Sequence, residues 1–147
     1  MKLNKIGFTL IELIIVIFIV TTILSISVVS ISNVRQKGRD AQRVSDVRQI
    51  QLALEMYRRD VGVYPEEIIF GERLSHPENS SIVYLSSVPN NPSPRNDGDC
   101  PNSNYIYHSN GNKYFIQFCL GEKSGDIKRG INCASSTGVS NEECETL

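Results

Sequence analysis

The hydrophobic residues of this chain are distributed very unevenly. A nearly unbroken apolar run extends from Phe8 to Ile31, with one charged residue, Glu12, and no glycine or proline. About 20 apolar residues at about 1.5 Å each suffice to cross a bilayer core of about 30 Å as a helix. The run is longer than the apolar region of a secretory signal peptide. The pattern therefore predicts a transmembrane helix over residues 8–31, with a membrane as its surroundings.

A second, amphipathic pattern covers residues 32–64. Apolar residues recur there at spacings of three or four, which places them on one stripe of a helix. The stripe consists of Val44, Val47, Ile50, Leu54, Tyr57 and Val61. The opposite face is predicted to hold Arg35, Asp46, Arg48, Gln49, Glu55, Arg58 and Arg59. Because Gly62 and Pro65 end the pattern, the two segments together predict one helix of about 50 residues, about 80 Å long.

The remaining segment, residues 65–147, is predicted to form an antiparallel β head. An Asn-Gly pair at residues 110–111 separates two apolar runs, which is a strong β-hairpin signal. With this pair as the turn, Tyr107 opposes Tyr114, and Tyr105 opposes Ile116. The face shared by Tyr105, Tyr107, Tyr114, Ile116 and Phe118 is expected to cover the helix stripe.

A further short strand is expected within residues 80–85. The fold class is therefore predicted to be α+β, with a long N-terminal helix packed on a small antiparallel sheet.

All four cysteines lie beyond residue 99. Cys100 and Cys119 bracket the hairpin, and Cys133 and Cys144 enclose a tail rich in glycine and serine, so we favour these two pairings. Four cysteines allow three connectivities, and the spacing alone does not choose among them. The spacings contain no Cys-x-x-Cys, which disfavours a zinc site. Disulfides imply that the C-terminal region matures outside the cytoplasm.

Composition and charge narrow the function classes. The chain has 147 residues, a net charge of −1 and 40% hydrophobic residues, which argues against wholesale disorder and against a dedicated nucleic-acid binder. We find no phosphate-binding loop, catalytic triad or metalloprotease motif, so neither enzymatic activity nor a cofactor is expected. Asp97 and Asp99 flank a glycine and are weak calcium candidates, although such a pair is usually a turn.

Glu12 is the unusual residue of the apolar run, because a carboxylate in hydrocarbon costs at least a few kcal/mol. The sequence KIGFTLIE at residues 5–12 resembles the class III leader of type IV pilins and type II secretion pseudopilins. The resemblance implies that a prepilin peptidase removes residues 1–7 by cutting after Gly7, and methylates the new N-terminus at Phe8. It also implies that Glu12 pairs with the Phe8 ammonium of a neighbouring subunit during assembly.

The resemblance continues to Gly62-Val63-Tyr64-Pro65, a sequence similar to the end of the long helix in that family. It implies a structural subunit of a type IV pilus serving adhesion, DNA uptake or motility. A major pseudopilin of type II secretion is the alternative, and a membrane-anchored binding module that never polymerises is an alternative of another class. The implied partners are prepilin peptidase, other copies of the chain, and a pilus or secretion assembly platform.

The resemblance places the precursor in the cytoplasmic (inner) membrane with its head outside, and the assembled filament in the periplasm or outside the cell. Arg35, Arg39 and Arg43 follow the apolar run at spacings of four. The positive-inside rule would place these residues in the cytoplasm, whereas the leader and the cysteines favour the opposite side. We interpret the three arginines as a solvated helix face near lipid headgroups, or alternatively as a contact with acidic groups of adjacent subunits.

Overall fold

The computed structural model describes residues 7–142 and Cys144, while the side chains of residues 26–30 lie outside the description. Most of the predicted leader, residues 1–6, also lies outside the described residues. The chain divides into two compact units between residues 35 and 36. Helix α1, Leu10–Val61, contributes to both units and contains 52 residues. The single long helix predicted from the two apolar patterns is therefore confirmed.

Helix α1 ends where the sequence predicts. The N–H of Gly62 donates to the carbonyl of Arg58 over 2.8 Å, and Gly62 has a φ of +91°. Glycine adopts this left-handed conformation without the steric cost that other residues meet, so it commonly ends helices. Two residues later, the Tyr64 N–H donates to the Gly111 carbonyl over 2.8 Å. This bond ties the chain leaving the helix to the tip of the hairpin.

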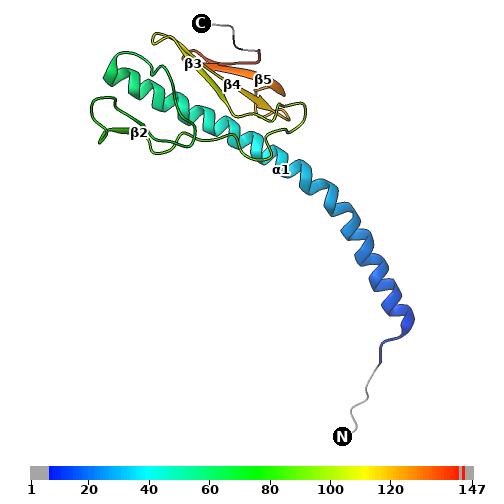
Figure 1. Cartoon of the computed structure of the whole chain (residues 1–147). Coiled ribbons are helices and arrows are strands. Elements are labelled where there is room, and N and C mark those ends of the chain that lie inside the picture. The colour runs from blue at the N-terminus through cyan, green and yellow to red at the C-terminus, as the bar shows by residue number, and fades with distance from the viewer. Residues whose placement is uncertain (1–6, 143, 145–147) are drawn as a thin grey trace. The chain divides into compact units, whose positions relative to one another are not determined.

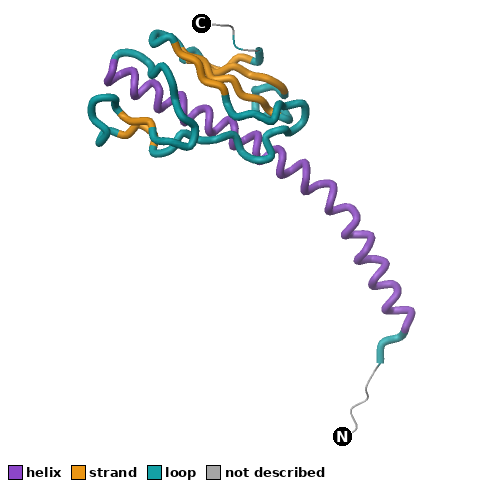
Figure 2. The backbone as a smooth tube through the Cα atoms, viewed as in Figure 1, coloured by secondary structure: helices purple, strands orange, loops and turns teal. Residues whose placement is uncertain are grey.

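The head contains two antiparallel sheets (Figure 1; Figure 2). The smaller sheet pairs β1, Leu74–Ser75, with β2, Val83–Leu85. The larger has the strand order β3-β4-β5-β6. Its strands are β3, Ile106–Ser109; β4, Tyr114–Leu120; β5, Gly130–Ser135; and β6, Gly138–Ser140. β2 is the short strand expected within residues 80–85, whereas β1, β5 and β6 were not predicted.

The hairpin between β3 and β4 is present, but its predicted register is wrong by two residues. Tyr107 opposes Ile116 instead of Tyr114. The side-chain oxygen of Asn110 accepts hydrogen bonds from the N–H groups of residues 112 and 113, and Gly111 has a φ of +81°. These interactions centre the turn one residue later than expected. Because a shift of two residues keeps every side chain on its face, the predicted shared face is unchanged.

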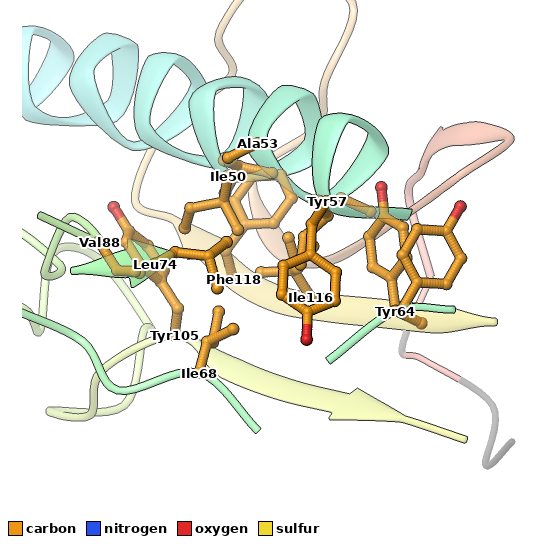
Figure 3. Close-up of a cluster of buried hydrophobic side chains, with 14 of the residues drawn as sticks. Ile50, Ala53, Tyr57, Tyr64, Ile68, Leu74, Val88, Tyr105, Ile116 and Phe118 are labelled. Atoms are coloured by element: carbon orange, nitrogen blue, oxygen red, sulfur yellow. The ribbon is translucent and has the colours of Figure 1, made fainter. Parts of the chain in front are cut away.

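The core lies between the amphipathic part of α1 and the larger sheet (Figure 3). In β4, buried and half-buried residues alternate along the whole strand, as expected for a sheet with one covered face. The buried apolar cluster comprises Val47, Ile50, Ala53, Leu54, Tyr57, Tyr64, Ile68, Leu74, Tyr84, Val88, Tyr105, Tyr114, Ile116, Phe118, Leu120 and Ala134. The predicted packing of the helix stripe on the hairpin face is therefore confirmed.

One residue of the predicted polar face of α1 is instead buried. Asp46 accepts a hydrogen bond from the Tyr105 hydroxyl over 3.0 Å. The placement of Asp46 on the solvent side was wrong because the helical period alone does not reveal a buried hydroxyl partner. Burial raises the pKa of the Asp46 carboxyl, and the bond from Tyr105 partly opposes that rise.

Two disulfides join Cys100 to Cys119 and Cys133 to Cys144, which is the pairing favoured from the sequence. Their Cα–Cα distances are 5.7 and 5.0 Å, within the range usual for disulfides. Cys119 occupies a half-buried position of β4, between the buried residues that face the helix. Its sulfur therefore belongs to the face of the sheet opposite the core.

Candidate functional site

The predicted processing and assembly residues lie at the start of α1. Gly7, Phe8 and Thr9 precede the helix, and Glu12 lies in its first turn. The Glu12 carboxylate oxygen Oε2 accepts from the Thr9 N–H over 3.0 Å and from the Thr9 hydroxyl over 2.8 Å. The Glu12 N–H in turn donates to Thr9 Oγ1 over 3.4 Å. This reciprocal arrangement is a capping box, which satisfies N–H groups that a helix start leaves unpaired.

The capping box has a consequence for Glu12. Its carboxylate is held beside the backbone of Thr9, next to the predicted cleavage junction between Gly7 and Phe8. A negative charge at this position is also favoured by the helix dipole. Thr9 was not identified from the sequence, although the spacing Thr-x-x-Glu before an apolar run is a known signature of a helix start.

The apolar surface of this segment has no cover within its own unit. Phe8 is 84% exposed, and every apolar side chain from Leu10 to Val20 is at least 47% exposed. A helix that is apolar on all sides is normally buried in protein or in lipid. The segment therefore requires a partner surface.

Among the described residues, no helical stretch combines the length and the hydropathy that a membrane crossing requires. The predicted segment of residues 8–31 includes residues 26–30, whose side chains lie outside the described part of the chain.

A second site, at residues 36–147, is a cluster of buried charges that we call the Arg43 cluster. It consists of Arg39, Asp40, Arg43, Asn91 and Asp97. The Arg43 guanidinium is fully buried and donates to Asp40 over 2.6 Å, to Asn91 over 2.8 Å and to Asp97 over 2.9 Å. It also donates to the Pro94 carbonyl over 3.0 Å. Arg43 thus has both charged and neutral acceptors.

Asp97 completes the cluster by accepting from two arginines. Its oxygens accept hydrogen bonds from Arg39 Nε over 2.7 Å and from Arg39 Nη2 over 2.5 Å, in addition to the hydrogen bond from Arg43. Chiefly because of the hydrogen bonds from Arg39, the pKa of the Asp97 carboxyl lies below its usual value. The same bonds raise the pKa of Arg39. The negative charges of the two carboxylates in the cluster therefore compensate the positive charges of its two guanidinium groups.

This cluster corrects the interpretation of the arginine series. Arg43 and Arg39 neither form a solvated face nor remain free for acidic groups of another subunit, because both bind Asp97 of the same chain. Arg35 alone of the three is exposed. Sequence reasoning missed Asp40 and Asn91, although Asp40 and Arg43 have the i,i+3 spacing of a helical ion pair.

The calcium candidates have other partners. Asp97 is bound by Arg39 and Arg43, and Asp99 forms a surface ion pair with Arg129. Within the described residues, no group of three or more acidic, histidine or cysteine side chains is placed to hold a metal ion. The geometry gives the calcium hypothesis no support.

Comparisons with known proteins agree with the N-terminal resemblance. Residues 2–28 match the prokaryotic N-terminal methylation motif. Over 90 residues, the chain is 30% identical to the type II secretion system core protein G of Vibrio cholerae serotype O1. The matched region covers 61% of this chain and 54% of that protein, so the chain spans about half the length of the curated relative it matches. No solved structure matches the chain significantly.

Together, the motif and the relative confirm the resemblance to the pilin and pseudopilin family. The motif lies on the segment that contains Gly7, Phe8 and Glu12, and the long helix on an antiparallel sheet is a pilin-like arrangement.

Proposed function

We propose that this chain is a structural subunit of a filament of the pilin or pseudopilin type. Processing after Gly7 frees Phe8, and the subunit polymerises through the apolar part of α1. The observation that carries the proposal is the exposed apolar surface from Leu10 to Val20, which coincides with the N-terminal methylation motif. In the precursor a membrane covers this surface, and in the filament the helices of neighbouring subunits replace the lipid. Repetition of one such head-to-tail contact generates an open helical filament.

Glu12 has a specific role in this mechanism. Cleavage after Gly7 creates an α-ammonium at Phe8, four residues before the carboxylate. An ammonium of a neighbouring subunit neutralises Glu12 in a low-dielectric helical bundle, where an unpaired charge is costly. The correct axial position is then the one that brings the two charges together. The role of the chain is thus structural, with prepilin peptidase as the enzyme that acts on it.

Two machines use such subunits. The resemblance of the leader and the long helix is common to both, and the type IV pilus expected from the sequence is the first candidate. The similarity to a type II secretion system core protein G is the specific observation that supports the second candidate, a major pseudopilin. The two candidates differ in the assembly platform that incorporates the subunit, so deletion of each platform in the producing cell separates them.

The decisive experiment is mass spectrometry of material sheared from cells, without reduction. We expect a filamentous fraction in which the chain begins at Phe8 and carries one added methyl group. Glu12→Ala should sharply reduce recovery of filaments, whereas Glu142→Ala, which removes an exposed carboxylate near the other end, should not. A chain that still begins at Met1 in cells with an active prepilin peptidase, or normal filaments from Glu12→Ala, would overturn the mechanism.

A further inference from the structure

The Arg43 cluster connects three segments that are distant in sequence. Asp40 and Arg43 lie on α1, and Asn91 and Asp97 lie on the loop before β3. The third segment follows β4, where the N–H groups of residues 121 and 122 donate to the two oxygens of Asp40 over 3.1 and 2.9 Å. The buried charges on the helix are therefore fully compensated only when both loops are in place.

The Cys100–Cys119 disulfide joins these two loops at the cluster. Cys100 follows Asp97 by three residues, and its N–H donates to the Asp97 carbonyl over 3.1 Å. Cys119 precedes Gly121 by two residues. The backbones also touch, because a Cβ atom added at Gly98 would lie 2.8 Å from the Gly121 oxygen. The covalent bond thus holds the loop that supplies Asp97 against the segment that supplies the amides for Asp40.

The second disulfide lies outside the Arg43 cluster and therefore serves as an internal comparison. Cys133–Cys144 joins β5 to the C-terminal region. Among the described residues, the hydrogen bonds of the Arg43 cluster do not reach β5, β6 or Cys144. Any dependence of the cluster on oxidation should therefore be specific to Cys100 and Cys119.

We propose that formation of the Cys100–Cys119 disulfide closes the Arg43 cluster and thereby acts as a redox-dependent switch for docking of the loops on α1. The reaction is thiol–disulfide exchange, in which the two thiols form one disulfide and an external disulfide compound is reduced to two thiols. While the thiols are reduced, the loops must be ordered without a covalent link, and a buried guanidinium that lacks its carboxylate is strongly unfavourable. The proposal does not depend on filament formation.

The first test uses thermodynamic reciprocity, because a disulfide that favours the closed cluster must itself be favoured by it. The oxidised full chain in detergent micelles is equilibrated with graded mixtures of reduced and oxidised glutathione. Free thiols are then alkylated, and peptide mass spectrometry quantifies each disulfide. The variant is Arg39→Gln, because the Arg39 side chain is 21% exposed and its loss leaves the Arg43 bonds available to maintain the fold.

We expect Arg39→Gln to make Cys100–Cys119 at least about fivefold easier to reduce, with Cys133–Cys144 unchanged in the same molecules. The matched control is Arg129→Gln, which removes an exposed ion pair with Asp99 from the same loop and should behave like the parent chain. An equal change at both disulfides, or a change at neither, would overturn the proposal.

The second test compares two variants of the full chain that each lack one disulfide. Hydrogen exchange is measured for the backbone amides of residues 36–46. Cys100→Ser with Cys119→Ser should accelerate their exchange at least about tenfold, and Cys133→Ser with Cys144→Ser should not. If both variants exchange alike, the disulfides act only on global stability and the switch is refuted. If the first variant does not fold, the glutathione experiment decides, since it uses a chain that contains all four cysteines.

Discussion

The hydroxyl of Tyr105 donates a hydrogen bond to the Asp46 carboxylate over 3.0 Å, and both side chains are buried. The bond links the residue just before β3 to the second half of α1. Burial also raises the pKa of Tyr105, so its hydroxyl remains protonated and available as a donor. A polar pair thus fixes the position of the hairpin along the buried face of the helix.

Removal of this donor should be costly. Tyr105→Phe leaves the buried Asp46 carboxylate without its partner, and we expect a loss of about 1–3 kcal/mol of unfolding free energy. The Asp46 pKa should rise further, because the bond that opposes the effect of burial is gone. Denaturant unfolding measures the first effect and a titration of the carboxyl by NMR measures the second. Asp46→Asn in the Tyr105→Phe background should recover part of the lost unfolding free energy, because it removes the buried charge. If it recovers none, the Tyr105 hydroxyl does not act by stabilising the Asp46 carboxylate.

The stability that the Asp97 carboxylate contributes to the folded chain should decrease at acidic pH. Its pKa is lowered in the folded state, so its contribution to stability is present above its pKa in the unfolded chain, about 3.9, and is lost as the pH falls toward the folded value. Asp97→Asn should therefore be less stable than the parent at pH 7, and the gap should narrow below about pH 4. Asp46 has a pKa shift of opposite sign, but it is present in both chains and cancels in the comparison. A gap independent of pH would contradict this prediction.

Two glycines should respond to alanine in opposite directions. A Cβ atom at Gly121 would lie 2.7 Å from the Asp97 Cβ and 2.9 Å from its carbonyl carbon. Gly121→Ala should therefore destabilise the chain by about 1–3 kcal/mol. Gly38 lies in α1, and a Cβ atom added there would meet nothing within 4 Å beyond its chain neighbours and the adjacent helix backbone. Gly38→Ala should therefore add up to about 1 kcal/mol through helix propensity. Thermal unfolding of the two variants checks both signs.

The capping box predicts an effect of Thr9 on the start of the helix. Thr9→Val retains the shape of the side chain but removes the hydroxyl that bonds Glu12, and should cost about 1 kcal/mol in the first turn. Amide exchange at residues 10–13, measured in micelles, should therefore accelerate. Thr9→Ser retains the hydroxyl and should behave like the parent. Equal exchange in the valine and serine variants would show that the hydroxyl is unimportant.

The parts predictable from the sequence were those governed by periodicity. The stripe from Val44 to Val61 and the hairpin face of Tyr105, Tyr114 and Ile116 reflect side-chain geometry that repeats along a helix or strand. The exact hairpin register was not predictable, because it depends on which residues the Asn110 side chain caps. β5 and β6 were missed because most of their residues are small or polar; β5 pairs with β4, and β6 pairs with β5.

The Arg43 cluster could not be predicted from the sequence, for a different reason. Arginines on a helix are usually exposed, and their burial here depends on Asp97 and on amide groups about 80 residues away from Asp40. No local pattern reports such a distant partner. Cleavage after Gly7 rests on a contiguous motif and stays a prediction, whereas the structure shows the hydrogen bonds between Thr9 and Glu12.

The tyrosines of the core provide a spectroscopic signal that reports on its packing. The chain has no tryptophan, and each of its six tyrosines is buried in or packed against the core. Tyr57 contacts Tyr84, and Tyr64 contacts Tyr114 at ring-centroid distances of 5.4 and 4.6 Å. The apolar N-terminal segment contains phenylalanine but no tyrosine. The tyrosine bands of the near-ultraviolet circular dichroism spectrum and tyrosine emission therefore report on packing within residues 36–147, in the full chain or in an assembled filament. The N-terminal segment makes no contribution to these tyrosine signals, and no added label is needed.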